Sequence, residues 1–508
     1  MTEKATPETS TSASRDAKGI GTNLLTLISQ AALPAFHVQL ARLLHAGGYG
    51  VYTWSNGFVE MFSLLTLFGM DQAVTRYVSL ATADKDDRRA EVATGTALRV
   101  VLLSGVFISL ALVLSAPLVA RVQGKPELEA PLRLLAVVPI FYHATTIFLV
   151  ATQARQVMKY NFWVRGLLQP LGLFVLTGVA LRYSPTAEAA AIAVAVGMAT
   201  TTIAAAMFYG RELSLGRTLR AVVSGPADWA VIKLAIPLVL TNLVWALQGR
   251  IDAFFLGHYR GTEEMGAYAA CVLYVQSISQ LRGAFDPVVS AAIPPALARG
   301  AVGELNETIK RQTRWLALAA MPLAVLFAGF GDGLLVVFGK EFTQGAPAMI
   351  ALSVGHTINA LSLSAFAIPM SGHARYSTYA AITSLVIQAI LLPLLLPRFG
   401  LTGAAISSAA GIGIAQGLQA LFAWRLVGVH GMSVGLLKTA MAAGLAFVVG
   451  RIVYSAIDDA ALRFFVGVGV AALVYVGALA LFGLDAEEKK TLRDALSALK
   501  ARLRARRS

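Results

Sequence analysis

Three arginines, Arg42, Arg250 and Arg282, interrupt long apolar stretches of the sequence. A charge at the middle of a membrane-spanning helix costs about 2.5–3.5 kcal/mol on insertion scales, so such a side chain faces a cavity or a partner. Arginine keeps its charge at every physiological pH and binds phosphate through paired, charge-assisted hydrogen bonds. Together with two nearby amides, Gln248 and Gln280, the three arginines predict a cationic cavity for an anionic substrate.

Three carboxylates lie in the same stretches and are candidates for taking up a coupling ion: Glu60, Asp252 and Asp286. Arg250 and Asp252 are two positions apart, so on a helix they point to different sides and cannot pair with each other. At least one of them therefore needs another partner, such as Glu60 or a ligand. Arg282 and Asp286 are four positions apart and could form an ion pair within one helix, so a structural role for this pair stays open beside the functional one.

These charges are informative because the chain is strongly hydrophobic. Of its 508 residues, 56% are hydrophobic and only 14% are charged, and the mean hydropathy is +0.67. An average soluble protein carries roughly 25% charged residues, and a soluble core could not bury so much apolar surface. The net charge is +14, and most lysines and arginines lie between and after the apolar stretches. This distribution favours anionic lipid over nucleic acid as a partner.

The apolar stretches predict an all-helical, polytopic membrane protein with about fourteen transmembrane helices. Each stretch has the length of about 20 residues that a hydrocarbon core of roughly 30 Å requires, and none has the alternation of a barrel strand. The predicted spans are 20–44, 47–70, 92–118, 130–151, 160–182, 187–208, 229–257, 265–291, 313–338, 346–370, 374–396, 402–425, 433–454 and 461–483. The first two are unusually polar.

Lysine and arginine are concentrated in the loops that follow the even-numbered spans, which predicts that both termini lie in the cytoplasm. Residues 1–18 are rich in serine, threonine and charge and are expected to be disordered. Residues 485–508 predict a basic amphipathic helix with leucines on one stripe. We expect this tail to bind anionic lipid of the inner leaflet, with a solvated basic tail as the alternative.

Matches at a nearly constant spacing predict that a unit of six spans is duplicated. Gly50 and Gly266, each two residues before a tyrosine, are 216 positions apart, as are Lys159 and Arg375. Because six is even, both halves would enter the membrane from the same side, related by an axis along its normal, an arrangement found in transporters. The predicted organisation is a first lobe at 19–220, a second lobe at 221–428, two additional spans at 429–484 and the two tails.

No motif in the sequence predicts an enzyme, a metal site or a cofactor. The single cysteine, Cys271, excludes a disulfide framework and a cysteine-based metal site. The sequence has no Walker lysine motif and no HExxH pattern. The predicted loops are too short to hold an extramembrane catalytic domain, so the function must reside in the bundle or at its surfaces.

Four segments carry a family resemblance: GGYGVYTWSNGFVEMFSLLTLFGMDQAVTRYVS at 47–79, RIDAFFLGHYRGTEEMGAYAA at 250–270, SGHARY at 371–376 and FGLTGAAISSAAG at 399–411. In these segments the chain resembles the Wzx-type oligosaccharide flippases of the polysaccharide-synthesis family. That family shares a superfamily with the multidrug and toxic-compound extruders (MATE) and the lipid II flippases. The motifs are specific for the superfamily and much less so for the substrate.

The resemblance implies two six-helix lobes in a V-shaped, MATE-like arrangement in a bacterial inner membrane. It implies that an undecaprenyl-pyrophosphate-linked oligosaccharide is moved from the cytoplasmic to the periplasmic leaflet, driven by a proton or sodium gradient. The arginines would hold the pyrophosphate, polar side chains the sugars, and Asp252 or Glu60 the coupling ion. The product would enter lipopolysaccharide, capsule or exopolysaccharide, with the protein acting alone or beside a polymerase and export machinery.

Two other functions stay open. One is a MATE-type multidrug or cation antiporter on the same fold, although a cavity for cationic drugs would be lined by carboxylates and aromatic rings rather than by arginines. The other is an enzyme that acts on lipid-linked sugars, such as a glycosyltransferase, polymerase or ligase. Such an enzyme would need a sizeable outer loop, and the outer loops predicted here are short.

Overall fold

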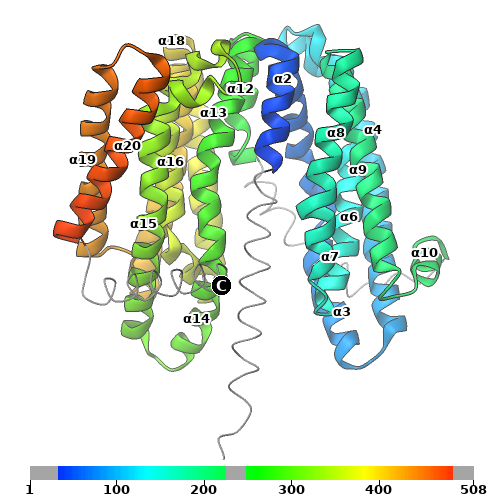
Figure 1. Cartoon of the computed structure of the whole chain (residues 1–508). Helices are drawn as coiled ribbons and strands as arrows, with labels where there is room; N and C mark the ends of the chain where they lie inside the picture. Colours follow the sequence, from blue (N-terminus) through cyan, green and yellow to red (C-terminus); the bar gives the residue numbers. More distant parts are fainter. Residues whose placement is uncertain (1–31, 225–246, 484–508) are drawn as a thin grey trace, which may run out of the picture. The chain divides into compact units, whose positions relative to one another are not determined.

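The computed structural model describes residues 32–224 and 247–483 (Figure 1). The predicted tails at 1–18 and 485–508 lie outside these ranges, as do the start of the first predicted span and most of the seventh, 229–257. All secondary structure of the described residues is helical, without a β-strand. The prediction of an all-helical fold is therefore confirmed.

The chain divides into two compact units, residues 1–269 and 270–508. The division falls within helix α13, Thr262–Gln280, so the described end of the seventh predicted span belongs to the first unit. The two units are described separately below. The lobes at 19–220 and 221–428 remain a prediction.

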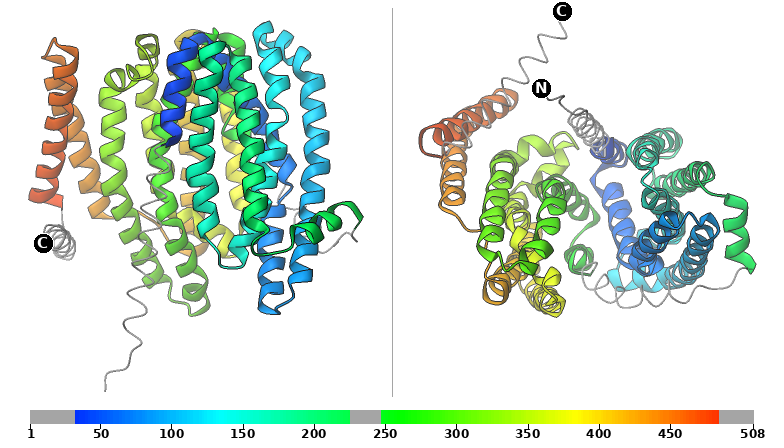
Figure 2. Two further views of the ribbon diagram at one scale, coloured as in Figure 1. Left: turned by 45° about the vertical axis from the view of Figure 1, so that its right-hand side comes forward. Right: turned by 90° about the horizontal axis from the view of Figure 1, so that it is seen from below.

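The first unit is a bundle of long helices with short connections (Figures 1 and 2). Its core contains Met70, Val78 and Ile147, all fully buried. The helix bounds are α2 (Ala32–Leu67), α3 (Met70–Ala83), α4 (Asp87–Gln123), a 3-10 turn (Pro126–Leu128), α5 (Glu129–Leu135), α6 (Val138–Ala154), α7 (Lys159–Asn161), a π-helix (Phe162–Leu168), α8 (Gln169–Tyr183), α9 (Ala187–Tyr209), α10 (Leu215–Ser224) and α12 (Ile251–Tyr259). The Asp86 side chain caps α4 by accepting a hydrogen bond of 3.0 Å from the Arg89 backbone nitrogen.

The second unit begins within α13 and is also a helical bundle. Its last two helices, α19 and α20, pack against α15 through Ala317, Phe330 and Tyr454. The helix bounds are 3-10 turns at Leu281–Ala284, Lys340–Gly345 and Leu363–Phe366, α14 (Asp286–Ala298), α15 (Val302–Leu335), α16 (Ala346–Leu361), α17 (Ala367–Met370), α18 (Ala374–Phe422), α19 (Val434–Ser455), α20 (Ala460–Ala478) and π-helices at Ala423–Val427 and Leu479–Gly483.

Among the described residues, eight helices are long and apolar enough to cross a membrane, and nine if the bent pair within 340–370 counts as one span. One of the eight covers 54 residues, Ala374–Val427. At 1.5 Å per residue it would be about 80 Å long, far more than one crossing requires. Its backbone breaks at Gly400, where φ is 55°, between the predicted spans 374–396 and 402–425. The total of fourteen spans remains a prediction.

Helix α2 is broken in the same way at His45, where φ is 56°, in the gap between the first two predicted spans. A non-glycine residue rarely adopts this left-handed conformation, because its β-carbon crowds the following carbonyl group. The second part of α2 begins with Gly47, Gly48 and Gly50. The absence of side chains at these positions allows a neighbouring backbone to come close.

Gly50 on α2 and Gly266 on α13 lie where these two helices touch backbone to backbone. A β-carbon added to Gly50 would be 1.9 Å from the Thr262 carbonyl oxygen, and one added to Gly266 would be 2.2 Å from the Ala46 carbonyl oxygen. Ala46 and Thr262 are 216 positions apart, as are the two glycines. The contact is thus reciprocal, as expected for segments related by a twofold axis.

Replacing Gly50 by alanine is expected to lower the free energy of unfolding by about 1–3 kcal/mol, because the added methyl group forces the two backbones apart. The measurement is the thermal unfolding midpoint of the detergent-purified protein. Gly172→Ala on α8 is the matched control, since a β-carbon there meets nothing within 4 Å. Equal midpoints for the two variants would contradict the tight contact.

Candidate functional site

An ion pair joins two of the charged residues singled out from the sequence. The Arg250 guanidinium donates to the Glu60 carboxylate on α2, across 190 positions of the chain. The other carboxylate oxygen of Glu60 accepts a hydrogen bond of 2.8 Å from the Asn56 side-chain amide. The side chains of Arg250 and Glu60 are 41% and 47% exposed. Arg250 and Asp252 are too close in sequence to pair with each other, and the structure shows that the partner of Arg250 is Glu60. Both charged side chains remain accessible to solvent.

Arg250 lies where the seventh predicted span is interrupted. Residues 249 and 250 form a turn, and α12 begins at Ile251. The Arg250 carbonyl oxygen already accepts the first helical bond, of 3.2 Å, from the Phe254 nitrogen. Interrupted spans with polar residues at the break are typical of substrate sites in transporters, because the irregular backbone must line a cavity.

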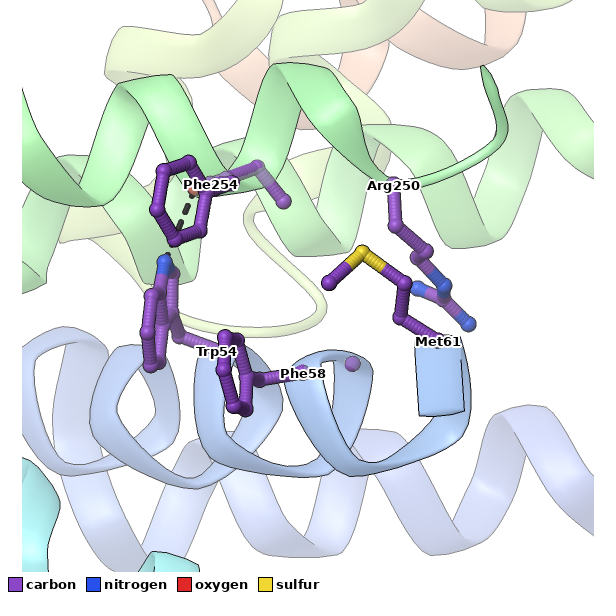
Figure 3. A pocket seen from close by; sticks show the side chains of 7 residues that line it. Trp54, Phe58, Met61, Arg250 and Phe254 are labelled. Atoms are coloured by element: carbon purple, nitrogen blue, oxygen red, sulfur yellow. Dashed lines mark hydrogen bonds between the residues drawn. The ribbon is translucent and has the colours of Figure 1, made fainter. Parts of the chain in front are cut away.

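Aromatic rings cover the space beside Arg250. Trp54, Phe58 and Phe254 line a pocket together with Met61 and Arg250 (Figure 3). The Trp54 and Phe58 rings are stacked, with centroids 5.3 Å apart, and the Phe254 ring is 6.3 Å from each. The indole nitrogen of Trp54 donates a hydrogen bond of 2.9 Å to the Ala253 carbonyl oxygen, which fixes the ring against α12. The pocket therefore combines apolar and aromatic walls with one charged side chain, Arg250, whose partner Glu60 lies outside the lining.

Asp252 points away from this pair and is buried, with 7% exposure. Its carboxyl accepts hydrogen bonds of 2.6 Å from the Tyr268 hydroxyl on α13 and 2.8 Å from the Ala253 backbone nitrogen. A buried carboxyl group requires such donors, since desolvation without them is costly. Asp252 thereby ties α12 to the start of α13.

Replacing Tyr268 by phenylalanine should lower the free energy of unfolding by about 1.5–3 kcal/mol, the usual contribution of a hydrogen bond to a charged group. The control is Tyr274→Phe, which loses a hydrogen bond of 3.1 Å to a neutral acceptor, the Leu334 carbonyl oxygen, and should cost about 1 kcal/mol. Chemical denaturation in detergent micelles compares the two. A smaller loss for Tyr268→Phe than for Tyr274→Phe would contradict the role given to Asp252.

In the second unit, Arg282 and Asp286 form the ion pair that their spacing allows. The Arg282 Nε donates to an Asp286 carboxylate oxygen at 3.0 Å. The same guanidinium donates to the Asn359 carbonyl oxygen at 3.0 Å and lies over the Phe366 ring, 4.7 Å from its centroid. The Arg282 side chain is only 15% exposed. It is therefore held on three sides, and Asp286 is more exposed, at 32%.

A set of polar side chains that the sequence did not single out continues from Asn359. The Asn359 amide donates to Ser279 at 3.1 Å and accepts from Gln416 on α18 at 2.8 Å. Ser279 also hydrogen-bonds His356 at 2.8 Å. Asparagine, serine and glutamine are common in apolar spans as interhelical hydrogen-bonding residues, so the sequence alone offered no signal that these would meet.

For the flippase function that the resemblance implies, replacing Arg282 by alanine is expected to abolish transport while the protein still inserts into the membrane. The variant loses the ion pair and the hydrogen bond to α16, and it leaves Asp286 without its guanidinium. Polysaccharide output and the amount of protein in the membrane fraction are the two measurements. Normal output at normal protein levels would remove Arg282 from the site.

The remaining candidates are placed as follows. Gln248 is buried at 8% exposure, two residues before Arg250. Gln280 is exposed on the last turn of α13, and Arg42 is exposed on α2, three residues before the break at His45. Within the described ranges no three histidine, cysteine or carboxylate side chains are grouped as metal ligands would be.

The helical fold of the described residues has counterparts among solved structures of membrane proteins. Among solved structures, the lipid II flippase MurJ in an inward closed conformation superposes with a TM-score of 0.70, covering 91% of this chain and 98% of that chain at 13% identity. An inward-facing MATE multidrug transporter of the MOP superfamily superposes with a TM-score of 0.64 at 14% identity, covering 81% of this chain and 99% of that chain. These likenesses establish a MurJ- and MATE-like fold.

The sequence itself defines the family. The family model described as "Polysaccharide biosynthesis protein" matches residues 17–300, more than half of the chain. The chain therefore belongs to the polysaccharide biosynthesis protein family. A comparison with curated proteins finds no match. The family resemblance read from the sequence is confirmed.

Proposed function

We propose that this protein moves a polyprenyl-pyrophosphate-linked oligosaccharide, with undecaprenol as the lipid, from the cytoplasmic to the periplasmic leaflet of a bacterial inner membrane. The oligosaccharide is used for lipopolysaccharide, capsule or exopolysaccharide. Membership of the polysaccharide biosynthesis family and a fold like that of a lipid II flippase support this proposal. The protein makes and breaks no covalent bond in this function. Both termini lie in the cytoplasm.

The observation that carries the proposal is the accessible Arg250–Glu60 pair beside a wall of aromatic rings. A half-exposed ion pair contributes only about 0–1 kcal/mol, so a stronger ligand can open it. A pyrophosphate offers Arg250 paired, charge-assisted hydrogen bonds of that kind. The apolar C–H faces of sugar rings can stack on Phe58 and Phe254, which are partly exposed, while the buried Trp54 ring packs against both of them.

Opening the Arg250–Glu60 pair links substrate binding to ion binding, because the substrate binds Arg250 and the ion binds Glu60. Once the pyrophosphate holds Arg250, Glu60 loses its cationic partner. Release of the pyrophosphate on the periplasmic side then leaves Glu60 open to a proton or a sodium ion from that side, and the return of Arg250 to Glu60 on the cytoplasmic side expels the ion there. The exchange of partners thereby couples an ion gradient to substrate movement, with the Arg282–Asp286 pair as a second ion-responsive group in the other unit.

The proposal is tested by measuring the amount and sidedness of polyprenyl-linked oligosaccharide in cells that lack the gene. The expected result is accumulation on the cytoplasmic leaflet with loss of one surface polysaccharide, and the mass of the accumulated lipid identifies the sugar. Normal sidedness and normal surface polysaccharide would overturn the proposal. Cross-linking in cells that carry the gene tests whether a polymerase or export machinery is a partner.

One observation favours a second candidate, a MATE-type antiporter of organic cations. The partly exposed rings of Phe58 and Phe254 could also bind a flat cation through cation–π attraction, with Coulomb attraction to Glu60, the partner of Arg250. In that case Arg250 would be the group that the cation displaces from Glu60. Gene loss would then cause sensitivity to toxic cations, with lipid-linked oligosaccharide unchanged.

A further inference from the structure

Helix α10, Leu215–Ser224, lies at the edge of the first unit and runs across the long helices rather than along them (Figures 1 and 2). It follows α9 after a short connection at residues 210–214. Its contacts are with the first turns of α4, at residues 91–99. Since α4 has 37 residues and is about 55 Å long, this contact lies near one end of a helix that exceeds the hydrocarbon core of roughly 30 Å.

The inner side of α10 is fixed to α4 by a buried carboxylate. Glu91, whose side chain is 1% exposed, accepts hydrogen bonds from Arg217 at 2.5 and 2.7 Å and from the Ser214 backbone nitrogen at 2.8 Å. At the other end of α10, the Arg99 guanidinium donates to the carbonyl oxygens of Ala221 and Val222. A paired arginine at each end therefore fixes both the position and the rotation of this helix.

In this fixed orientation, the side of α10 that faces away from α4 carries both apolar and basic residues. Leu219 and Val223, one turn apart, are 48% and 85% exposed. Arg220 is exposed next to Leu219, and Arg211 is exposed in the connection before α10, with its guanidinium over the Phe208 ring. Neither arginine forms an ion pair with a carboxylate in the part of the chain that the structure describes. Apolar residues flanked by arginines on a helix that lies across the spans are typical of a helix at a membrane surface.

We propose that the outer side of α10 binds the head groups of anionic phospholipids, with Leu219 and Val223 inserted among the acyl chains and Arg211 and Arg220 on the phosphates. Charge complementarity favours anionic phospholipid as the ligand, because the outer side of α10 carries arginine and Leu215–Ser224 contains no exposed carboxylate. Arg217, which pairs with Glu91 and is still 59% exposed, connects the lipid surface to α4. The proposal holds whichever substrate the protein carries.

The first test locates α10 relative to the bilayer in the full-length protein. Cys271, the only cysteine, is replaced by serine, and single cysteines are introduced as Val223→Cys and Leu219→Cys for spin labelling in vesicles of phosphatidylcholine and phosphatidylglycerol. Leu114→Cys, 69% exposed on α4, is the lipid reference, and Asp84→Cys in the α3–α4 connection is the water reference. Labels at 219 and 223 should resemble position 114 in their relative accessibility to oxygen and to a water-soluble nickel chelate.

The second test measures the preference for anionic lipid. Native mass spectrometry of the purified protein counts bound phosphatidylglycerol in competition with phosphatidylcholine. Each of Arg211→Gln and Arg220→Gln should weaken this preference about fivefold, the effect of roughly 1 kcal/mol per basic residue at an anionic surface. Arg133→Gln, which removes a half-exposed arginine paired with Glu129, is the charge-matched control and should leave the preference unchanged.

Three results would overturn the proposal. Labels at 219 and 223 as accessible to the nickel chelate as position 84 would place α10 in water, and labels shielded from both reagents would show that protein covers it. An unchanged lipid preference in both arginine variants would equally reject the head-group site. The labelled and arginine positions are exposed, and the buried Cys271→Ser change is shared by the reference at 114, so a failure of binding is distinct from a failure of folding.

Discussion

Replacing Arg250 by alanine is expected to reduce transport of the lipid-linked oligosaccharide by about 10- to 150-fold, because a charge-assisted hydrogen bond is worth about 1.5–3 kcal/mol. Arg250→Lys should recover only part of this loss. Lysine keeps the positive charge, but it cannot offer a pyrophosphate two parallel donors in one plane. The measurement is uptake of a short-chain polyprenyl pyrophosphate sugar into proteoliposomes.

The matched control is Arg133→Ala. Arg133 is also a half-exposed arginine in an ion pair, with Glu129 at 2.9 Å, and it lies outside the aromatic pocket. Transport by this variant should equal that of the unmodified protein. Transport by Arg250→Ala at the level of Arg133→Ala would remove Arg250 from the substrate site.

Replacing Glu60 by glutamine is expected to separate substrate binding from transport. Glutamine keeps the size of the side chain and its oxygen for Asn56, but it releases Arg250 from its competitor. Binding of a pyrophosphate sugar should therefore tighten by up to about fivefold, the equivalent of the 1 kcal/mol that an exposed ion pair can contribute. Transport driven by an ion gradient should be lost, because a neutral amide cannot take up a proton.

Titration calorimetry and gradient-driven uptake measure these two effects on the same preparation. The double variant Glu60→Gln with Arg250→Gln completes a mutant cycle, in which the gain in binding should disappear. If Glu60→Gln transports normally under an imposed gradient, the coupling role passes to Asp252 or Asp286. A gain in binding that persists without Arg250 would show that Glu60 does not compete with the substrate for that arginine.

The fold could be predicted because its main determinants are local. The length of each apolar run sets a span, and the division of residues 374–425 into two spans at Gly400 follows from the limited thickness of a bilayer. The continuation of the second span as α3, to Ala83, was not predicted, because residues 70–83 are amphipathic and carry Asp71 and Arg76. Such a segment cannot be distinguished from a loop by hydropathy alone.

The site could be predicted only in part, and sequence distance is the reason. Arg282 and Asp286 are four positions apart, so helical geometry alone suggested their pair. For Arg250 the same geometry excluded Asp252, but it could not choose between Glu60 and a ligand. The contact of Trp54 and Phe58 with Phe254 depends on how α2 and α12 pack. Aromatic residues are common in apolar spans, so their presence in the sequence does not predict this contact.

The reciprocal contact of Gly50 and Gly266 bears on ancestry. A protein with only the first six spans would hold both halves of that contact, a carbonyl oxygen at position 46 and a glycine at position 50, and could pair with an identical copy of itself. Duplication and fusion would convert that homodimer into one chain while keeping the interface. At the same spacing of 216, Glu60 corresponds to Gln276 and Arg250 to Pro34. The charged pair therefore has no counterpart at the predicted repeat spacing, so a duplication would have left one charged site in place of two equivalent ones.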